Sequence, residues 1–186
     1  TMGREYADHE VIKQLQLLSD EENLHDCTLL FRANSAKVRT SSFLLSLCSP
    51  VMRTMLCGCF REGTNRDACI DDVSSDAFEN VIAIWMGKTV TTERIEDLAA
   101  IGSAADRFGI KGVCEQAENT ICAVITEDPS RCVEVLNCCA AMPFPRAESV
   151  AVSEIFDHFD DLCESGKLCE ASADLLCALL ESDELC

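Results

Sequence analysis

The chain has 186 residues, 48% of them hydrophobic, and a formal net charge of −18 at pH 7. This length suits one domain, or one domain with part of a second, and the apolar content suffices for a buried core. A charge this negative repels phosphate backbones and anionic bilayers, so we expect neither nucleic acid nor a membrane surface as a partner.

Neither a membrane anchor nor an export signal is visible in the sequence. No stretch approaches the roughly 20 apolar residues of a spanning helix. The start, TMGREYADHE, lacks the apolar core of a signal peptide. We therefore expect the protein inside the cell, in the cytoplasm, with the nucleus as an alternative location.

The 14 cysteines should be free thiols in that reducing compartment. There is no C-x-x-C pair, and the three histidines are isolated, so we expect no zinc site and no other metal. Cys48, Cys132 and Cys139 share helical faces with apolar residues and are interpreted as small core side chains.

Charge is distributed unevenly along the chain. Residues 27–66 carry six Lys or Arg against one acid, Glu62, whereas residues 146–186 carry eleven acids against Arg146 and Lys167. We interpret this asymmetry as two solvated faces rather than a device that steers a ligand.

The N-terminal third predicts a helix followed by a hairpin. Val11, Ile12, Leu15 and Leu18 recur at helical spacing and predict a helix over residues 8–18. CTLLF at 27–31 and AKVR at 36–39 flank the polar turn RANS, which is typical of two paired strands.

Two short helices and a strand are expected next. Pro50 suits the first turn of a helix and separates residues 43–48 from residues 50–59. The first of these helices is predicted to place Phe43, Leu44, Leu47 and Cys48 on one face, and CIDDV at 69–73 predicts a short strand.

The rest of the chain is helical by pattern. Apolar stripes cover residues 78–85, 95–105 and 113–124, and TEDPSR at 126–131 marks the clearest boundary. Further stripes follow over residues 132–139, 152–159 and 175–180.

Enzymatic motifs are absent from the sequence. Gly58 and Gly63 lack the lysine that a phosphate loop requires, and the scattered histidines offer no partner for a nucleophile. The acid pairs at Asp71 and Asp160 resemble ordinary helix or strand ends. We therefore expect no catalytic residue and no cofactor, and a function carried by interaction surfaces.

Several strings occur in a characteristic order: HDCTLLF, SFLLSLCSPVMRTML, CIDDVSSDAFENVIAIWMGK, LAAIGSAADRFGIKGV and ASADLLCALLESDEL. Together they resemble a BTB/POZ domain that runs into the first part of a BACK domain, as in the Kelch-like family. The resemblance implies an α+β fold, a small mixed sheet surrounded by helices, with an all-α extension. Residues 1–125 would form the BTB/POZ domain with an N-terminal dimerisation helix, and residues 126–186 a partial BACK domain.

The resemblance also implies the partners. A homodimer would form through the first helix, whose apolar side chains are Val11, Ile12, Leu15 and Leu18. The scaffold cullin-3 would bind the triplet Phe60, Arg61 and Glu62, which follows the second paired helix, together with Met55, Val135 and Leu136. The chain would then be the adaptor of a ubiquitin ligase, with the substrate held by a domain that this sequence lacks.

Alternatives remain open from the sequence alone. Phe60 and the first helix could each pack on their own domain, and the chain could be a homo-oligomerisation scaffold without a ligase role. A co-repressor module is disfavoured because Ser41 and Ser42 stand where the family often has His and a basic residue. A redox or electrophile sensor is the further alternative, through Cys57 and Cys59 near Arg53, Arg61 and Arg66.

Overall fold

The computed structural model describes residues 2–58, 66–89, 91–139, 144–173 and 176–177. The chain divides into two compact units. Unit 1 comprises residues 1–90 and 104–113, and unit 2 comprises residues 91–103 and 114–186. None of the helices in the described ranges has the length and hydropathy that a bilayer-spanning segment requires.

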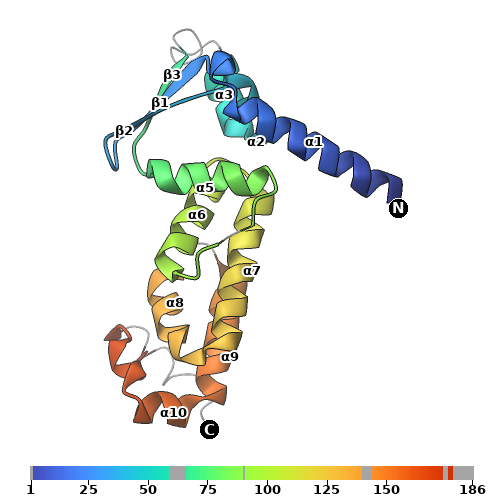
Figure 1. The fold of residues 1–186 in the computed structure, drawn as a ribbon. Helices are drawn as coiled ribbons and strands as arrows, with labels where there is room; N and C mark the ends of the chain where they lie inside the picture. Colours follow the sequence, from blue (N-terminus) through green and yellow to red (C-terminus); the bar gives the residue numbers. More distant parts are fainter. Residues whose placement is uncertain (1, 59–65, 90, 140–143, 174–175, 178–186) are drawn as a thin grey trace. The chain divides into compact units, whose positions relative to one another are not determined.

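Unit 1 contains a three-stranded mixed sheet (Figure 1). β1 (Cys27–Phe31) lies in the middle, with β2 (Ala36–Thr40) antiparallel on one side and β3 (Asp67–Ile70) parallel on the other. The predicted hairpin and mixed sheet are confirmed, although β3 begins two residues before the predicted strand.

The central strand alternates between the core and solvent. Cys27, Leu29 and Phe31 are buried, whereas Leu30 on the opposite face is 38% exposed. Side chains on a strand point to alternate faces, so one face of the sheet packs on the helices and the other is open.

Three of the helices of unit 1 begin at serine caps. α1 (Met2–Asp20) and the short η1 (Glu22–Leu24) precede the sheet, and α2 (Ser42–Cys48), α3 (Pro50–Cys57) and α5 (Ser75–Trp85) follow its strands. Ser41, Ser49 and Ser74 precede α2, α3 and α5, and each side chain accepts a backbone N–H from the first turn. These caps satisfy donors that lack a partner within the helix.

The buried face of α2 differs from the prediction. Leu44 and Cys48 are buried with Leu45, as a core face requires, but Phe43 and Leu47 are exposed. The helix is seven residues long and apolar except for two serines, so no charged position fixes which face turns inward. The structure therefore leaves two large apolar side chains on the surface of unit 1.

Aromatic rings form the centre of the core of unit 1. The Phe78 ring lies 5.3 Å from the Phe31 ring and 5.2 Å from the Phe108 ring, measured between centroids. These rings join strand β1, helix α5 and the segment after α6, and tilted arrangements of this kind are favoured between aromatic side chains. Ser49 donates its hydroxyl to the Phe108 carbonyl oxygen at 2.6 Å, which fixes the start of α3 to the same core.

Unit 2 is helical in its described residues. α6 (Ile95–Arg107) and α7 (Lys111–Glu127) contribute residues to both units. They are followed by η2 (Pro129–Arg131), α8 (Cys132–Cys139), α9 (Pro145–Asp157), α10 (Phe159–Glu164) and η3 (Lys167–Glu170). α8 packs against α9, so the predicted helical extension is confirmed up to residue 173. Most of the last predicted stripe, residues 175–180, lies outside the described residues.

Candidate docking surfaces

The predicted cullin-binding triplet begins three residues after the end of α3. α3 ends at Cys57, and the Gly58 N–H closes its last turn on the Thr54 carbonyl oxygen at 3.1 Å. Phe60, Arg61 and Glu62 lie outside the described residues, so their contacts remain a prediction.

The side of α3 that faces solvent is partly apolar. Met52 and Leu56 are buried in unit 1, Met55 is half-buried, and Val51 is exposed. Arg53 donates its Nε–H to the Ser46 carbonyl oxygen at 2.8 Å, which holds α3 against α2. Met55, predicted as a cullin contact, is therefore partly accessible on the helix that leads to the triplet.

Only part of the predicted dimer face is free. Val11 is 57% exposed and Leu18 is also exposed, whereas Ile12 and Leu15 are half-buried. A Cβ at Gly87 would lie 3.1 Å from Ile12 Cγ2, and Gln16 donates to the Met86 carbonyl oxygen at 2.8 Å. One side of α1 therefore packs on its own unit, and the other side is open to a partner.

The sequence interpretation missed additional apolar candidates for docking. Phe43 is 63% exposed, and Leu47, four residues later on the same side of α2, is exposed as well. Leu17 on α1 is also exposed. Exposed apolar side chains that gather on neighbouring elements are typical of protein interfaces.

Asp26, Ser42 and Arg66 form a cluster of polar contacts in unit 1. The Asp26 carboxylate accepts the Ser42 N–H at 2.8 Å and the Ser42 hydroxyl at 2.9 Å, and it forms an ion pair with Arg66. Arg66 also donates to the Ser42 hydroxyl oxygen at 3.2 Å. Asp26 is therefore paired within its own unit, with Arg66 as its cation and Ser42 as a hydrogen-bonding partner.

Of the two cysteines predicted as redox or electrophile sensors, the structure describes one. Cys57 is exposed, and its Sγ lies 3.2 Å from the Ser46 hydroxyl oxygen. Cys59 lies outside the described residues. Arg66, which was expected to favour a thiolate, is held on Asp26 instead. The sensor function stays a prediction.

The cysteines interpreted as core residues are buried where the structure describes them. Cys48 and Cys132 are buried, and desolvation raises the pKa of each thiol to about 12. Burial also raises the pKa of Cys27 to about 11. These three side chains are protonated at neutral pH and behave as small apolar residues.

The predicted cullin contacts on α8 point into unit 2. Val135 and Leu136 are both buried, so neither side chain is accessible in this conformation. Their position follows from the packing of α8 against α9, which covers the apolar side of α8. A partner could reach them only if the two helices separated.

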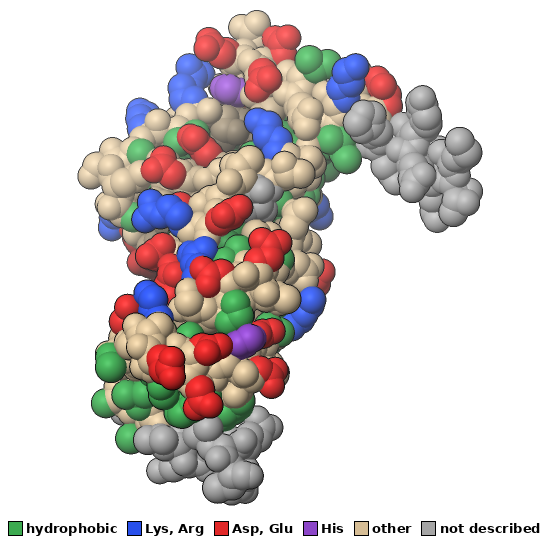
Figure 2. Space-filling model, turned by 60° about the horizontal axis from the view of Figure 1, so that its bottom comes forward, with side chains coloured by type: hydrophobic (Ala, Val, Ile, Leu, Met, Phe, Trp, Pro, Cys, Tyr) green, Lys and Arg blue, Asp and Glu red, His purple; other side chains and the backbone are tan. Residues whose placement is uncertain are grey.

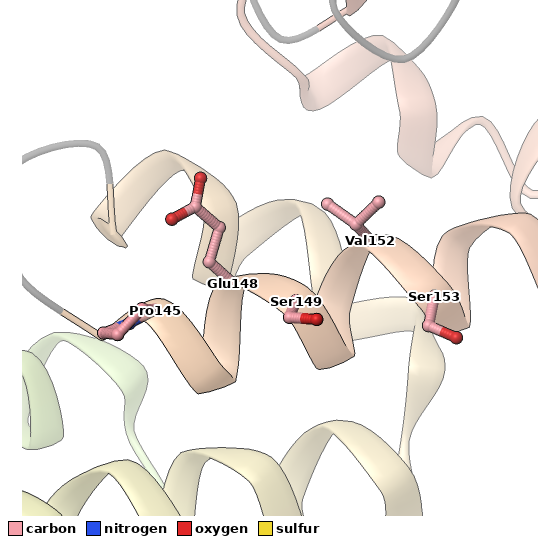
Figure 3. A pocket seen from close by; sticks show the side chains of 5 residues that line it. All are labelled: Pro145, Glu148, Ser149, Val152 and Ser153. Carbon is pink, nitrogen blue, oxygen red and sulfur yellow. The ribbon is translucent and has the colours of Figure 1, made fainter. Parts of the chain in front are cut away.

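α9 instead presents an accessible hollow. A cavity of about 460 Å³ is lined by Pro145, Glu148, Ser149, Val152 and Ser153, and Glu148 and Val152 point to the same side of the helix (Figure 3). The N-terminus of α9 is fixed by Glu118 on α7, whose carboxylate accepts the N–H of Arg146 at 2.8 Å. This hollow therefore lies on a helix with an anchored start.

Acidic side chains are more numerous than Lys and Arg side chains on the face that Figure 2 shows, in keeping with the net charge of −18. Among the residues that the structure describes, no group of three or more His, Cys, Asp or Glu side chains is arranged to hold a metal ion.

Comparisons with known proteins found a matching family model and two similar curated relatives. The model of the BTB/POZ domain family matches residues 15–124. Kelch-like protein 40 of Xenopus laevis is 24% identical over 175 residues, which are 92% of this chain and 27% of the relative. The Xenopus tropicalis protein of the same name is 23% identical with the same coverage. The chain therefore spans about a quarter of the length of these curated relatives.

Two solved structures are similar to part of the chain. The BTB domain of zebrafish PATZ1 has a TM-score of 0.47 and 17% identity, and the match covers 60% of this chain and 88% of that one. The BTB domain of human gigaxonin has a TM-score of 0.46 and 15% identity, with 58% and 85% covered.

Proposed function

Because this chain belongs to the BTB/POZ domain family, we propose that it is the dimeric adaptor module of a cullin-3 type ubiquitin ligase. The module performs no chemistry; it links the cullin to a substrate protein through a domain outside these 186 residues. Residues 1–125 act as the BTB/POZ domain and residues 126–186 as the start of a BACK domain. The Xenopus relatives are about three and a half times as long as this chain, which leaves room in those proteins for a domain that binds a substrate.

The observation that carries the proposal is the position of the triplet. Phe60, Arg61 and Glu62 follow the end of α3 within five residues, where cullin-3 adaptors of this family have a hydrophobic-x-Glu triplet. Met55, on α3 itself, adds partly accessible apolar surface. An aromatic anchor next to charged residues is a common centre of a protein interface.

A second contact is proposed on α9. In Kelch-like relatives this region receives the N-terminal segment of the cullin, and here the hollow along α9 offers Val152 between polar side chains. Since Val135 and Leu136 are buried, they support this surface from within rather than contact the cullin.

The dimer is proposed to form through α1 and α2. Val11 and Leu18 supply exposed apolar surface on α1, and Phe43 and Leu47 supply it on α2. Burying such side chains against a second copy stabilises an assembly by about 1.5–3 kcal/mol for each large side chain. Two-fold pairing would use the same residues twice, as closed dimers do.

Calorimetry with the purified N-terminal domain of cullin-3 tests the docking site. Phe60→Ala should weaken binding by about 2 kcal/mol or more, which is about thirtyfold in the dissociation constant. Leu24→Ala, a change at an exposed apolar residue of η1, should leave binding unchanged. If the unmutated chain shows no detectable binding, the function is a homo-oligomerisation scaffold instead.

A further inference from the structure

The outer edge of the sheet in unit 1 is an open strand. β2 pairs with β1 on one side, and no described strand pairs with its other side. An unpaired edge presents backbone N–H and C=O groups that can pair with another extended chain. β2 (Ala36–Thr40) is the outer strand in Figure 1 as well.

This edge is held in a fixed conformation. The hairpin turn before β2 is tied to α5, because the Asn34 amide donates to the Ser75 hydroxyl oxygen at 2.9 Å. Ser35 in the same turn has φ 57°, a left-handed conformation that closes the hairpin. A strand that is already ordered loses little conformational entropy when a partner strand adds to it.

The open edge is positively charged in an acidic protein. Residues 27–58 contain four Lys or Arg and no acid, whereas the whole chain carries −18. On β2 the side chains of Lys37 and Arg39 are exposed, and neither forms an ion pair among the described residues. Among the described residues, the Arg39 side chain donates only to the His25 carbonyl oxygen, at 2.9 Å, and that acceptor is uncharged.

The opposite edge of the sheet differs in charge. Asp67 opens β3 and pairs in register with Thr28, which in turn faces Arg39 on β2. Adjacent strands lie about 4.8 Å apart, so the acidic edge is about 10 Å from the basic one. The sheet therefore presents a positive edge at β2 and a negative side chain at β3.

A second copy of this chain does not suit the edge. If two β2 strands paired antiparallel about Val38, Lys37 of each copy would lie opposite Arg39 of the other. Like charges placed directly opposite each other destabilise a strand pair. Exposed cations on an edge strand are a common means of preventing such self-pairing.

We infer that the outer edge of β2 binds an extended acidic peptide of another protein as an added strand. Carboxylates at alternate positions of the peptide lie opposite Lys37 and Arg39, while backbone hydrogen bonds provide the pairing. This function goes beyond cullin docking, which is proposed for α3, the triplet after it and α9. It does not depend on cullin docking.

A synthetic peptide of about eight residues that alternates Glu with Thr or Val is a direct probe. Fluorescence anisotropy of the labelled peptide should show saturable binding to the intact chain. Lys37→Glu with Arg39→Glu should weaken binding at least about tenfold, because attraction becomes repulsion. If Glu destabilises the fold, Lys37→Gln with Arg39→Gln removes the charges and should still weaken binding several-fold.

Two controls separate strand pairing from general attraction. Lys88→Glu with Lys111→Glu also replaces two exposed cations of unit 1 with two acids, so it changes the net charge as much as the β2 variant does. This control should leave peptide binding almost unchanged. A depsipeptide with esters in place of its central amides keeps the carboxylates but loses the N–H donors, and it should bind at least about tenfold more weakly.

Three outcomes would overturn the inference. They are the absence of binding by the unmutated chain, equal losses in the two charge-reversed variants, and equal affinity for the peptide and the depsipeptide. Calorimetry with cullin-3 on the same protein keeps this result separate from the proposed adaptor function, since each surface can fail alone.

Discussion

Gly102 lies in the interior of α6, where the Phe144 ring occupies the space that a side chain would need. A Cβ built at Gly102 would lie 2.0 Å from Phe144 Cζ and 2.6 Å from Cε1, far inside van der Waals contact. Phe144 is 1% exposed and precedes the first residue of α9. Gly102→Ala therefore forces the ring, and with it the start of α9, out of position.

The size of the effect follows from two opposing terms. Overpacking a core costs about 1–3 kcal/mol, and it costs more when a ring must leave the core. Replacing glycine with alanine inside a helix gains up to about 1 kcal/mol. We expect a net loss near 2 kcal/mol in the free energy of unfolding, or about 4–8 °C in the melting temperature.

Circular dichroism during thermal and urea unfolding measures this loss. Gly112→Ala is the matched control, because a Cβ at this position in α7 would meet no atom within 4 Å, and we expect it to be neutral or slightly stabilising. Phe144→Leu combined with Gly102→Ala should be less destabilising than the sum of the single changes, since the smaller side chain relieves the clash. A Gly102→Ala variant as stable as Gly112→Ala would refute the packing described for unit 2.

Two further predictions concern the dimer and the buried thiols. Val11→Asp with Leu18→Asp should raise the dimer dissociation constant, measured by light scattering, at least about hundredfold. The reason is the loss of about 3 kcal/mol of free energy from apolar burial. The control Lys13→Ser should leave the dimer intact. An unchanged dimer would exclude α1 from the interface. For the thiols, the folded-state pKa of Cys48 and of Cys132 is raised from 9.0 to about 12, so their contribution to stability is full below pH 9 and declines as pH rises toward 12. Replacing both with Ala should flatten this alkaline loss in urea titrations, and an unchanged slope would contradict the burial of these thiols.

Local patterns were sufficient to predict most of the fold. The hairpin followed from two β-favouring runs around a polar turn, and the junction between α2 and α3 followed from Pro50. In both cases the deciding residues are neighbours in sequence. The parallel pairing of β1 with β3 joins segments about 40 residues apart, so here the resemblance to a family was needed.

The candidate surfaces were harder to predict because burial depends on distant segments. Periodicity placed Phe43 and Leu47 in the core, but α2 is too short and too apolar for its pattern to distinguish inside from outside. Val135 and Leu136 are buried in unit 2, where α8 packs against α9, and no sequence motif indicates that packing. Arg66 pairs with Asp26 across 40 positions, and no local motif indicates that pairing.

The central claim is that a dimer of this chain carries cullin-3, and the mass of the complex tests it most directly. Light scattering of the chain mixed with the N-terminal domain of cullin-3 should give the mass of two chains with two cullin domains. Phe60→Ala at the same concentration should give mainly the dimer and free cullin. A dimer that binds no cullin domain would contradict the proposed adaptor function. A complex whose mass is unaffected by Phe60→Ala would contradict the proposed docking site.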